Sequence, residues 1–201
     1  CFDKTGSQVV PMEYDEIREF VGGMARIRIY GKLGFINASG DVVVAPFSDE
    51  VENFSEGCCL VTMRNKVGLV NLQGDWIAAP MYEDGGSFSA GYAYLAQKGK
   101  YGYIDNSGEF VIPMKYSKAK SFNPVNKLAC VTEGDKWGVI DNKGNIIIDL
   151  NYDEMIIIPN ETQDVFVCTY DVDYNSENYK TKVLNEKNEE ILEEYDNITA
   201  I

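Results

Sequence analysis

The sequence predicts an all-β protein built from tandem repeats of about 34 residues. A glycine recurs at steps of 34, 34, 34 and 36 residues, as Gly6, Gly40, Gly74, Gly108 and Gly144. An independent phenylalanine recurs in the same register, as Phe20, Phe54, Phe88 and Phe122. Between these landmarks, short runs of alternating apolar and polar residues are separated by Gly, Asn and Asp, which is typical of strands joined by tight turns.

The third copy, "AYLAQKGKYGYIDNSGEFVIP", shows how the strands of one repeat follow each other. Residues 93–97 alternate between two faces and predict a first strand. Gly99-Lys100 then predicts a two-residue turn, as do Asn65-Lys66 and Asp135-Lys136 in other copies. Residues 101–105 and 110–113 predict two further strands. We therefore expect each repeat to be a three- to four-stranded β-meander.

A second turn is marked by an Asn or Asp three residues before the recurring glycine. The side-chain oxygen of such a residue accepts a hydrogen bond from the backbone two residues on, and the glycine then takes a left-handed conformation. A calcium loop is the alternative, but calcium needs six to eight oxygen ligands and several carboxylates, so the turn is favoured. The positions are Asp3, Asn37, Asn71, Asp105 and Asp141, with a weaker copy at Asn185.

One face of each meander is predicted to form the core. A small residue, a larger apolar residue two positions on, and an aliphatic residue on the next strand share this face. A single repeat buries too little apolar surface, so neighbouring repeats must stack. Cys59 takes the small-residue position and is expected to be a buried structural thiol. The three sets are Ala25, Cys59, Ala93 and Ala129; Ile27, Val61, Leu95 and Val131; and Ile36, Val70, Ile104 and Ile140.

Composition limits the classes of partner. The chain has 201 residues and a formal net charge of -14, so nucleic acid is not an expected partner, because phosphate binding needs clustered Lys and Arg. No apolar run approaches the roughly 18 residues of a membrane span. The sequence has no histidine and no Cys-x-x-Cys, and we expect neither a metal site nor a cofactor.

Catalytic motifs are also missing from the sequence. It contains no Gly-x-Ser-x-Gly, no phosphate-binding loop and no dinucleotide-binding glycine pattern. A pair of carboxylates among the 32 acidic residues could still serve a glycosidase, because such a pair depends on geometry. Scattered acidic residues are more often solvated, so an enzyme is the least expected class.

The segment "KWGVIDNKGNIIIDLNYDEM" (136–155), with "KYGYIDNSGEFVIPMKY" and "KLGFINASGDVVVAPF", resembles the WG-containing repeat (KWG repeat) family. The resemblance covers residues 1–201 as a single β-repeat domain of about five and a half repeats, the last of them degenerate. It implies a β-rich, mostly bacterial protein without common catalytic residues. The family tryptophan is kept only at Trp137, and Leu33, Val67 and Tyr101 stand in its place elsewhere.

The repeats are expected to stack as an open twisted array, with a closed β-propeller as the alternative. A propeller usually closes by completing one blade from the two ends of the chain. Here the first and last units both contain the same half of the repeat, so the two ends duplicate each other. This duplication favours the open array.

We expect a non-catalytic binding or scaffold module whose partner is another protein. A glycan-binding module and a cell-envelope surface lipoprotein, with Cys1 as a lipid anchor, are the alternatives. A start in the middle of a repeat also fits a fragment of a longer repeat protein. The sequence does not decide between the bacterial cell envelope and the cytoplasm.

The candidate contact surface is one face of the third repeat. If Lys98 pairs with Tyr101 and Ala96 with Tyr103, four tyrosines share this face. Tyrosine suits a binding surface because it combines a large ring with a hydroxyl group and few rotatable bonds. The alternative is that this face packs against the next repeat, because the same positions are mostly apolar in other copies. The four residues are Tyr92, Tyr94, Tyr101 and Tyr103.

Overall fold

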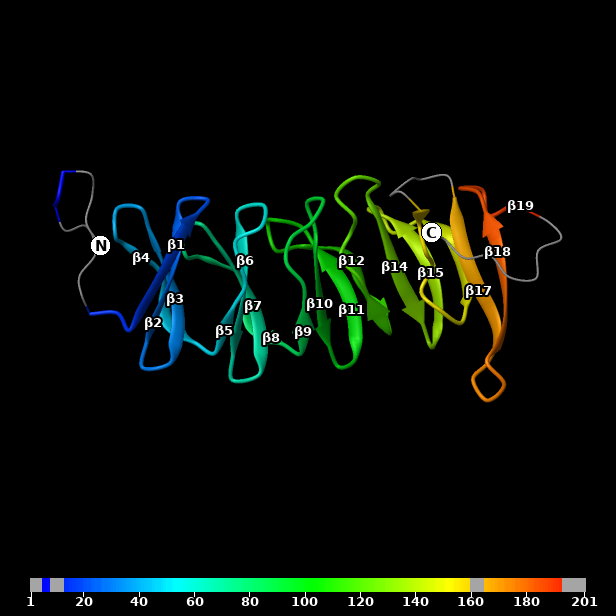
Figure 1. Ribbon diagram of the computed structural model, residues 1–201, viewed down its shortest axis with the longest axis horizontal. Helices are drawn as coiled ribbons and strands as arrows, with labels where there is room; N and C mark the ends of the chain where they lie inside the picture. The colour runs from blue at the N-terminus through cyan, green and yellow to red at the C-terminus, as the bar shows by residue number, and fades with distance from the viewer. Residues whose placement is uncertain (1–4, 8–12, 160–164, 193–201) are drawn as a thin grey trace. The chain divides into compact units, whose positions relative to one another are not determined.

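The computed structural model describes residues 5–7, 13–159 and 165–192 of the chain (Figure 1). The strands β1 to β19 make up the regular structure of these residues. The predicted turn at Asp3 and Cys1, the lipid anchor of the alternative interpretation, lie outside the described residues. The chain divides into two compact units, residues 1–87 with 106–108 and residues 88–105 with 109–201. Each unit is described by itself.

The first unit contains two four-stranded antiparallel meanders, and in both sheets the strands lie side by side in chain order. The first sheet consists of β1 (Glu16–Val21), β2 (Met24–Ile29), β3 (Lys32–Asn37) and β4 (Val42–Ser48). The second consists of β5 (Glu50–Val51), β6 (Cys58–Met63), β7 (Lys66–Asn71) and β8 (Trp76–Tyr82). The short β9 (Asp84–Gly85) follows them.

The second unit continues the same pattern. It begins with the neighbouring strands β10 (Ala93–Gln97), β11 (Lys100–Ile104) and β12 (Phe110–Tyr116). The next sheet consists of β13 (Lys118–Ala119), β14 (Leu128–Glu133), β15 (Lys136–Asp141) and β16 (Ile146–Tyr152). The last contains β17 (Phe166–Asp173), β18 (Asn178–Leu184) and β19 (Glu190–Leu192). No described sheet closes into a barrel, and the predicted all-β tandem-repeat fold of open sheets is confirmed.

The hairpin turns lie one residue earlier than predicted. Gln97 pairs with Lys100, so Lys98 and Gly99 form the turn, with φ of 53° and 68°. Positive φ at both central residues matches the right-handed twist of the two strands, which is why this turn is preferred. The prediction of Gly99-Lys100 was therefore wrong. The corresponding turns are Arg64–Asn65 and Gly134–Asp135, where Asn65-Lys66 and Asp135-Lys136 were expected.

This correction changes the cross-strand partners of the tyrosines and leaves their face unchanged. Tyr94 lies opposite Tyr103, and Ala96 lies opposite Tyr101. The predicted pairing of Ala96 with Tyr103 was thus wrong by two residues. Because side chains alternate with a period of two, a shift of two residues keeps each side chain on the same face.

The turn before the recurring glycine is confirmed. Asn37 Oδ1 accepts hydrogen bonds from the backbone N–H groups of Ser39 and Asp41, at 3.0 and 2.9 Å, and Gly40 has φ of 87°. In the last copy Asn188 stands in place of the glycine and has φ of 62°. Side-chain oxygens accept equivalent backbone bonds at Asn71, Asp105, Asp141 and Asn185.

A second recurring glycine lies where two strands come unusually close. A Cβ atom on Gly68 of β7 would lie 2.6 Å from the carbonyl oxygen of Ala78 and 2.7 Å from the nitrogen of Pro80 in β8. Only glycine allows this approach of the two backbones. The same crowding occurs at Gly34, Gly102 and Gly138.

The predicted core face is confirmed, since none of its twelve side chains is more than 3% exposed. The opposite face of the sheets is also largely buried. In the first unit, Met24 and Phe35 of the first sheet form one cluster with Val61 of the second. In the second unit, Val139 and Phe166 of successive sheets meet in the same way. Within each unit consecutive sheets therefore pack face to face, which explains why the strands read as nearly continuous apolar runs.

Candidate functional site

An acidic residue directly after the last strand of a sheet, such as Asp49 after β4, has a structural role. Asp49 accepts a hydrogen bond at 2.6 Å from the backbone N–H of Arg64, in the turn of the next hairpin, and forms an ion pair with Lys32. Asp153 forms the corresponding ion pair with Lys136. These lysine contacts are the main reason why the pKa values of both carboxyl groups lie below their usual range. The recurring polar residues thus hold hairpins together, and a binding function must be sought where the repeats differ.

The four cysteines of the described residues are buried within the sheets, and they are Cys58, Cys59, Cys130 and Cys168. Cys59 is fully buried, as expected for a structural thiol, and burial raises its pKa to about 12. Burial likewise raises the pKa of Cys130 to about 11 and that of Cys168 to about 12. Because the thiolate is the reactive form, these three groups are not nucleophiles at neutral pH.

The described residues form neither a metal-binding cluster nor a membrane-spanning helix. Residues 5–7, 13–159 and 165–192 contain no group of three or more Cys, Asp or Glu side chains placed to hold a metal ion. In the same ranges no helix has the length and apolar character required to cross a bilayer.

The four predicted tyrosines do lie together, and one of them belongs to the core. Tyr103 is fully buried, its hydroxyl donates to the carbonyl of Lys120 at 2.7 Å, and its ring centroid lies 4.6 Å from that of Phe122. For Tyr103 the alternative interpretation therefore holds, since its side chain is part of the core and not of an exposed contact surface. The other three are partly buried against the same cluster and stay predicted contact residues; they are Tyr92, Tyr94 and Tyr101.

The first unit contains an open cleft of about 550 Å³, lined by β1, β2 and β3 and by residues 53–54 between β5 and β6. Its apolar wall includes Met24, Phe35 and Phe54, and the two phenylalanine rings meet edge to face with centroids 5.0 Å apart. Arg18 of β1 and Arg26 of β2 supply charged groups to its lining. Two smaller hollows, of about 150 and 270 Å³, are also lined by Arg26.

The repeat provides an internal comparison for this cleft. Met24 corresponds to Tyr92 in the third copy, and Phe54 corresponds to Phe122. The Tyr92 and Phe122 rings lie 5.5 Å apart, and Phe122 is only 1% exposed. Phe54 remains only partly buried. In the second unit the ring of Tyr92 therefore covers Phe122. In the first unit Met24 leaves part of Phe54 uncovered beside the cleft.

Arg26 breaks the repeat pattern. The corresponding residues are Leu60, Tyr94 and Cys130, so a charge stands where other copies carry apolar or aromatic side chains. Arg26 lies opposite Phe35 in the sheet, on the face that borders the cleft. Within the described part of the chain its guanidinium has no hydrogen bond or ion pair. Our sequence reasoning missed this residue, although the charge at an otherwise apolar repeat position was the available signal.

Charged side chains of both signs surround Arg26. Glu16 accepts a hydrogen bond from Arg18 Nε at 2.8 Å and pairs with Arg28 Nη2 at 2.6 Å. The bond from Arg18 is the largest cause of the lowered pKa of Glu16, and the charges of Arg28 and Arg26 act in the same direction. Glu19 also lines the cleft. The cleft lining itself thus has two arginines and one glutamate, and Glu50 and Glu52 line one of the smaller hollows together with Arg26.

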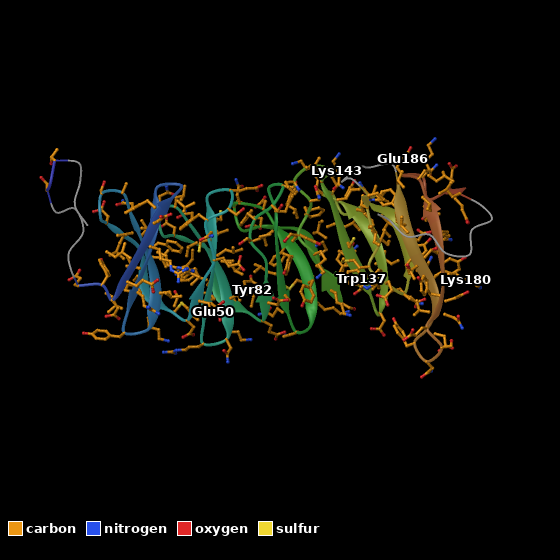
Figure 2. The ribbon with its side chains drawn as sticks, in the orientation of Figure 1. Glu50, Tyr82, Trp137, Lys143, Lys180 and Glu186 are labelled. Carbon is orange, nitrogen blue, oxygen red and sulfur yellow. The ribbon has the colours of Figure 1, made fainter. Side chains whose placement is uncertain are left out.

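The second unit has a cavity of its own, of about 540 Å³. Trp137, labelled in Figure 2, lines it together with Met155 and Tyr174. Lys118 Nζ lies 5.9 Å from the Trp137 ring, and the Tyr174 hydroxyl donates to Glu154 at 2.9 Å. This cavity combines an aromatic surface with carboxylates, the latter contributed by Asp135, Asp153 and Glu154.

Similar folds occur among solved structures. A eukaryotic initiation factor has a TM-score of 0.52 and 12% identity over 92% of this chain and 55% of that chain, so the chain spans about half its length. Hsv2 of Kluyveromyces lactis has a TM-score of 0.48 and 9% identity over 91% and 67% of the two chains. PorZ of Porphyromonas gingivalis has a TM-score of 0.41 and 10% identity over 91% and 26%. At 12% identity, the similarity to the initiation factor shows a shared fold and nothing about function.

No curated protein matches the chain. A family model does match, and it is the model of the WG containing repeat. It fits five consecutive segments, residues 1–32, 34–66, 68–101, 101–137 and 137–158, in agreement with the motif resemblance. Since these matches cover most of its length, the chain belongs to the WG-containing repeat family.

Proposed function

We propose that this chain is a non-catalytic binding module for another protein, with the Arg26-lined cleft of the first unit as its contact site. The observation that carries the proposal is a charged residue at an otherwise apolar repeat position beside an open cleft of about 550 Å³. Binding sites are commonly concave, mostly apolar and equipped with a few polar groups, and this cleft has all three properties.

The charged groups of the cleft support binding over catalysis. Arginine does not lose its proton in proteins, so Arg18 and Arg26 are poor acid–base groups. The pKa of the nearby Glu16 is lowered, whereas a general acid at neutral pH needs a raised one. Electrostatic attraction, hydrogen bonding and apolar contact are therefore the interactions that this cleft offers a ligand.

The proposal is tested by filling the cleft with the residue that the third repeat uses. Met24→Tyr should fold, because Tyr92 occupies the corresponding position in a well-packed interface. We expect this variant to lose the partner protein that the wild type captures from lysate of the source cell, while both melt within about 3 °C of each other.

The matched control is Val125→Tyr, which adds a tyrosine at a position of the second unit that is 64% exposed. It should keep both capture and stability. If Met24→Tyr retains full capture with an unchanged melting curve, the cleft is not the contact site and the proposal fails.

The cavity at Trp137 favours glycan binding as a second candidate function. An indole face offers apolar contact, and carboxylates accept hydrogen bonds from hydroxyl groups. Trp137→Leu installs the residue that the first repeat has at Leu33, so it should preserve the fold. A glycan array should show binding by the wild type that this variant loses. Equal binding by both proteins, or none by the wild type, would exclude this candidate.

A further inference from the structure

We infer that the cleft of the first unit recognises an extended peptide segment in which one carboxylate lies next to an apolar side chain. The carboxylate would bind the Arg26 guanidinium, and the apolar side chain would occupy the wall formed by Met24, Phe35 and Phe54. This inference rests on the proposed function of the cleft and names the ligand class that it accepts.

The carboxylate is indicated by the charge of the site. Three of the four arginines of the sequence lie in the first sheet, and Arg26 has no ion-pair partner among the described residues. A guanidinium presents two parallel N–H groups that match the two oxygens of a carboxylate. Arg18, Arg26 and Glu19 line the cleft, so its lining carries an excess of one positive charge, which matches one ligand carboxylate and disfavours a run of acidic residues.

The apolar neighbour is indicated by the rest of the lining. Phe35 is 3% exposed and fixed against Phe54, so this wall is preorganised. Met24 is unbranched and adapts its shape to different apolar ligands. The third repeat shows what the space accepts, because Tyr92 fills the corresponding position there. A ligand side chain that is aromatic or aliphatic can take the same place.

A peptide, rather than a small anion, is indicated by the strand that borders the cleft. β1 is the edge strand of the first sheet and is six residues long, with its last four residues exposed. In the second sheet the corresponding edge pairs with β6 through β5 and a bridge between Ser55 and Cys58, so the greater exposure of the end of β1 is what sets it apart. A long edge strand presents backbone N–H and C=O groups to which an extended peptide can add.

The pairing of β1 with β2 also directs side chains into the cleft. Its register shifts between Ile17 and Phe20, so β1 contains a bulge. A bulge changes the direction of successive side chains, and the neighbours Arg18 and Glu19 indeed both line the cleft. A peptide beside β1 would therefore have charged groups of both signs within reach, which fixes its register.

The test is a selection of random seven-residue peptides displayed on phage against the wild-type chain. Enriched peptides should carry Asp or Glu next to an aromatic or aliphatic residue. Their affinity as synthetic peptides, measured by fluorescence polarisation, should fall about tenfold or more for Arg26→Leu, and equally when the peptide acid is replaced by its amide.

Two further variants complete this design. Arg26→Leu installs the residue found at Leu60, and Arg26→Gln is a polar alternative in case the leucine variant melts early. Arg64→Asn removes the same charge in a turn outside the cleft and should leave affinity unchanged.

Three results would overturn the inference. They are enriched peptides without an acidic residue, wild-type affinity for the enriched peptides in both Arg26 variants, and binding of an acidic oligosaccharide such as oligogalacturonate where no peptide is enriched. The last of these would identify a different class of ligand. Loss of partner capture by Met24→Tyr together with any of these results would leave the proposed function intact and reject only the peptide chemistry.

Discussion

Ile104 ends β11, and Asp105 begins the turn that follows, so these neighbours stabilise the repeat in different ways. Ile104 is completely buried, whereas Asp105 Oδ1 accepts a backbone bond from Glu109 at 3.3 Å near the surface. Both roles could be predicted from the sequence, because the same residue types recur in every copy. Arg26 was not predicted, because a single departure from a repeat gains meaning only when the cleft beside it is seen.

Ile104→Ala should destabilise the protein more than Asp105→Ala. Removing a buried isoleucine side chain costs about 2–5 kcal/mol, since it also leaves a cavity. Losing a surface turn bond costs about 1 kcal/mol. The free energy of unfolding from urea titration gives both values, and the reverse order would mean that the assigned faces are wrong.

Gly68→Ala should cost about 3 kcal/mol or more, because the added methyl group would meet the β8 backbone at 2.6 Å and force two strands apart. Gly99→Ala is the matched control. It has φ of 68° but no atom within 4 Å of the added carbon, so only the backbone conformation resists, at about 1 kcal/mol. Equal losses of unfolding free energy in the two variants would contradict the close approach of β7 and β8.

At the scale of strands and hairpins, the number and order of elements followed from the sequence and their exact register did not. The turn at Lys98 and Gly99 shows the reason. Gly, Asn and Asp mark a tight turn, but they do not say which two residues are central. That choice depends on the twist of the paired strands, which allows Lys98 to take a positive φ.

The carboxylates that hold the hairpins should make stability depend on pH. In the folded state the pKa values of Asp49 and Asp153 lie below the ordinary value, mainly because of their lysine partners. The unfolded chain therefore binds more protons in this range, and stability falls as the pH drops below about 4. It should be constant between about pH 5 and 8 as far as these groups are concerned.

Thermal melts from pH 7 to 2.5 measure this effect. The Asp49→Asn and Asp153→Asn double variant should start with a lower melting temperature at pH 7 and show a shallower fall below pH 4 than the wild type. Parallel curves for the two proteins would show that these ion pairs contribute nothing to stability.

At the scale of the whole molecule, each repeat carries the same structural set of glycines, turn residues and apolar positions. These residues hold the sheets together, and they are not available to a ligand because they are buried or hydrogen-bonded within the sheets. The proposed recognition is therefore placed at positions that vary between copies, and Arg26 and Trp137 are two such positions. This division explains why the fold could be predicted from a repeat pattern and the proposed contact site could not.

The central claim, that the cleft of the first unit is the contact site, is tested most directly by photo-crosslinking in the source cell. A photoreactive phenylalanine replaces Val21, which lines the cleft and is 66% exposed, or Val125, which lies in the second unit and is 64% exposed. We expect a covalent adduct with a partner protein from position 21 and none from position 125. The adduct should disappear when Arg26→Leu is added. An adduct from position 21 that survives this change, or equal adducts from both positions, would contradict the account.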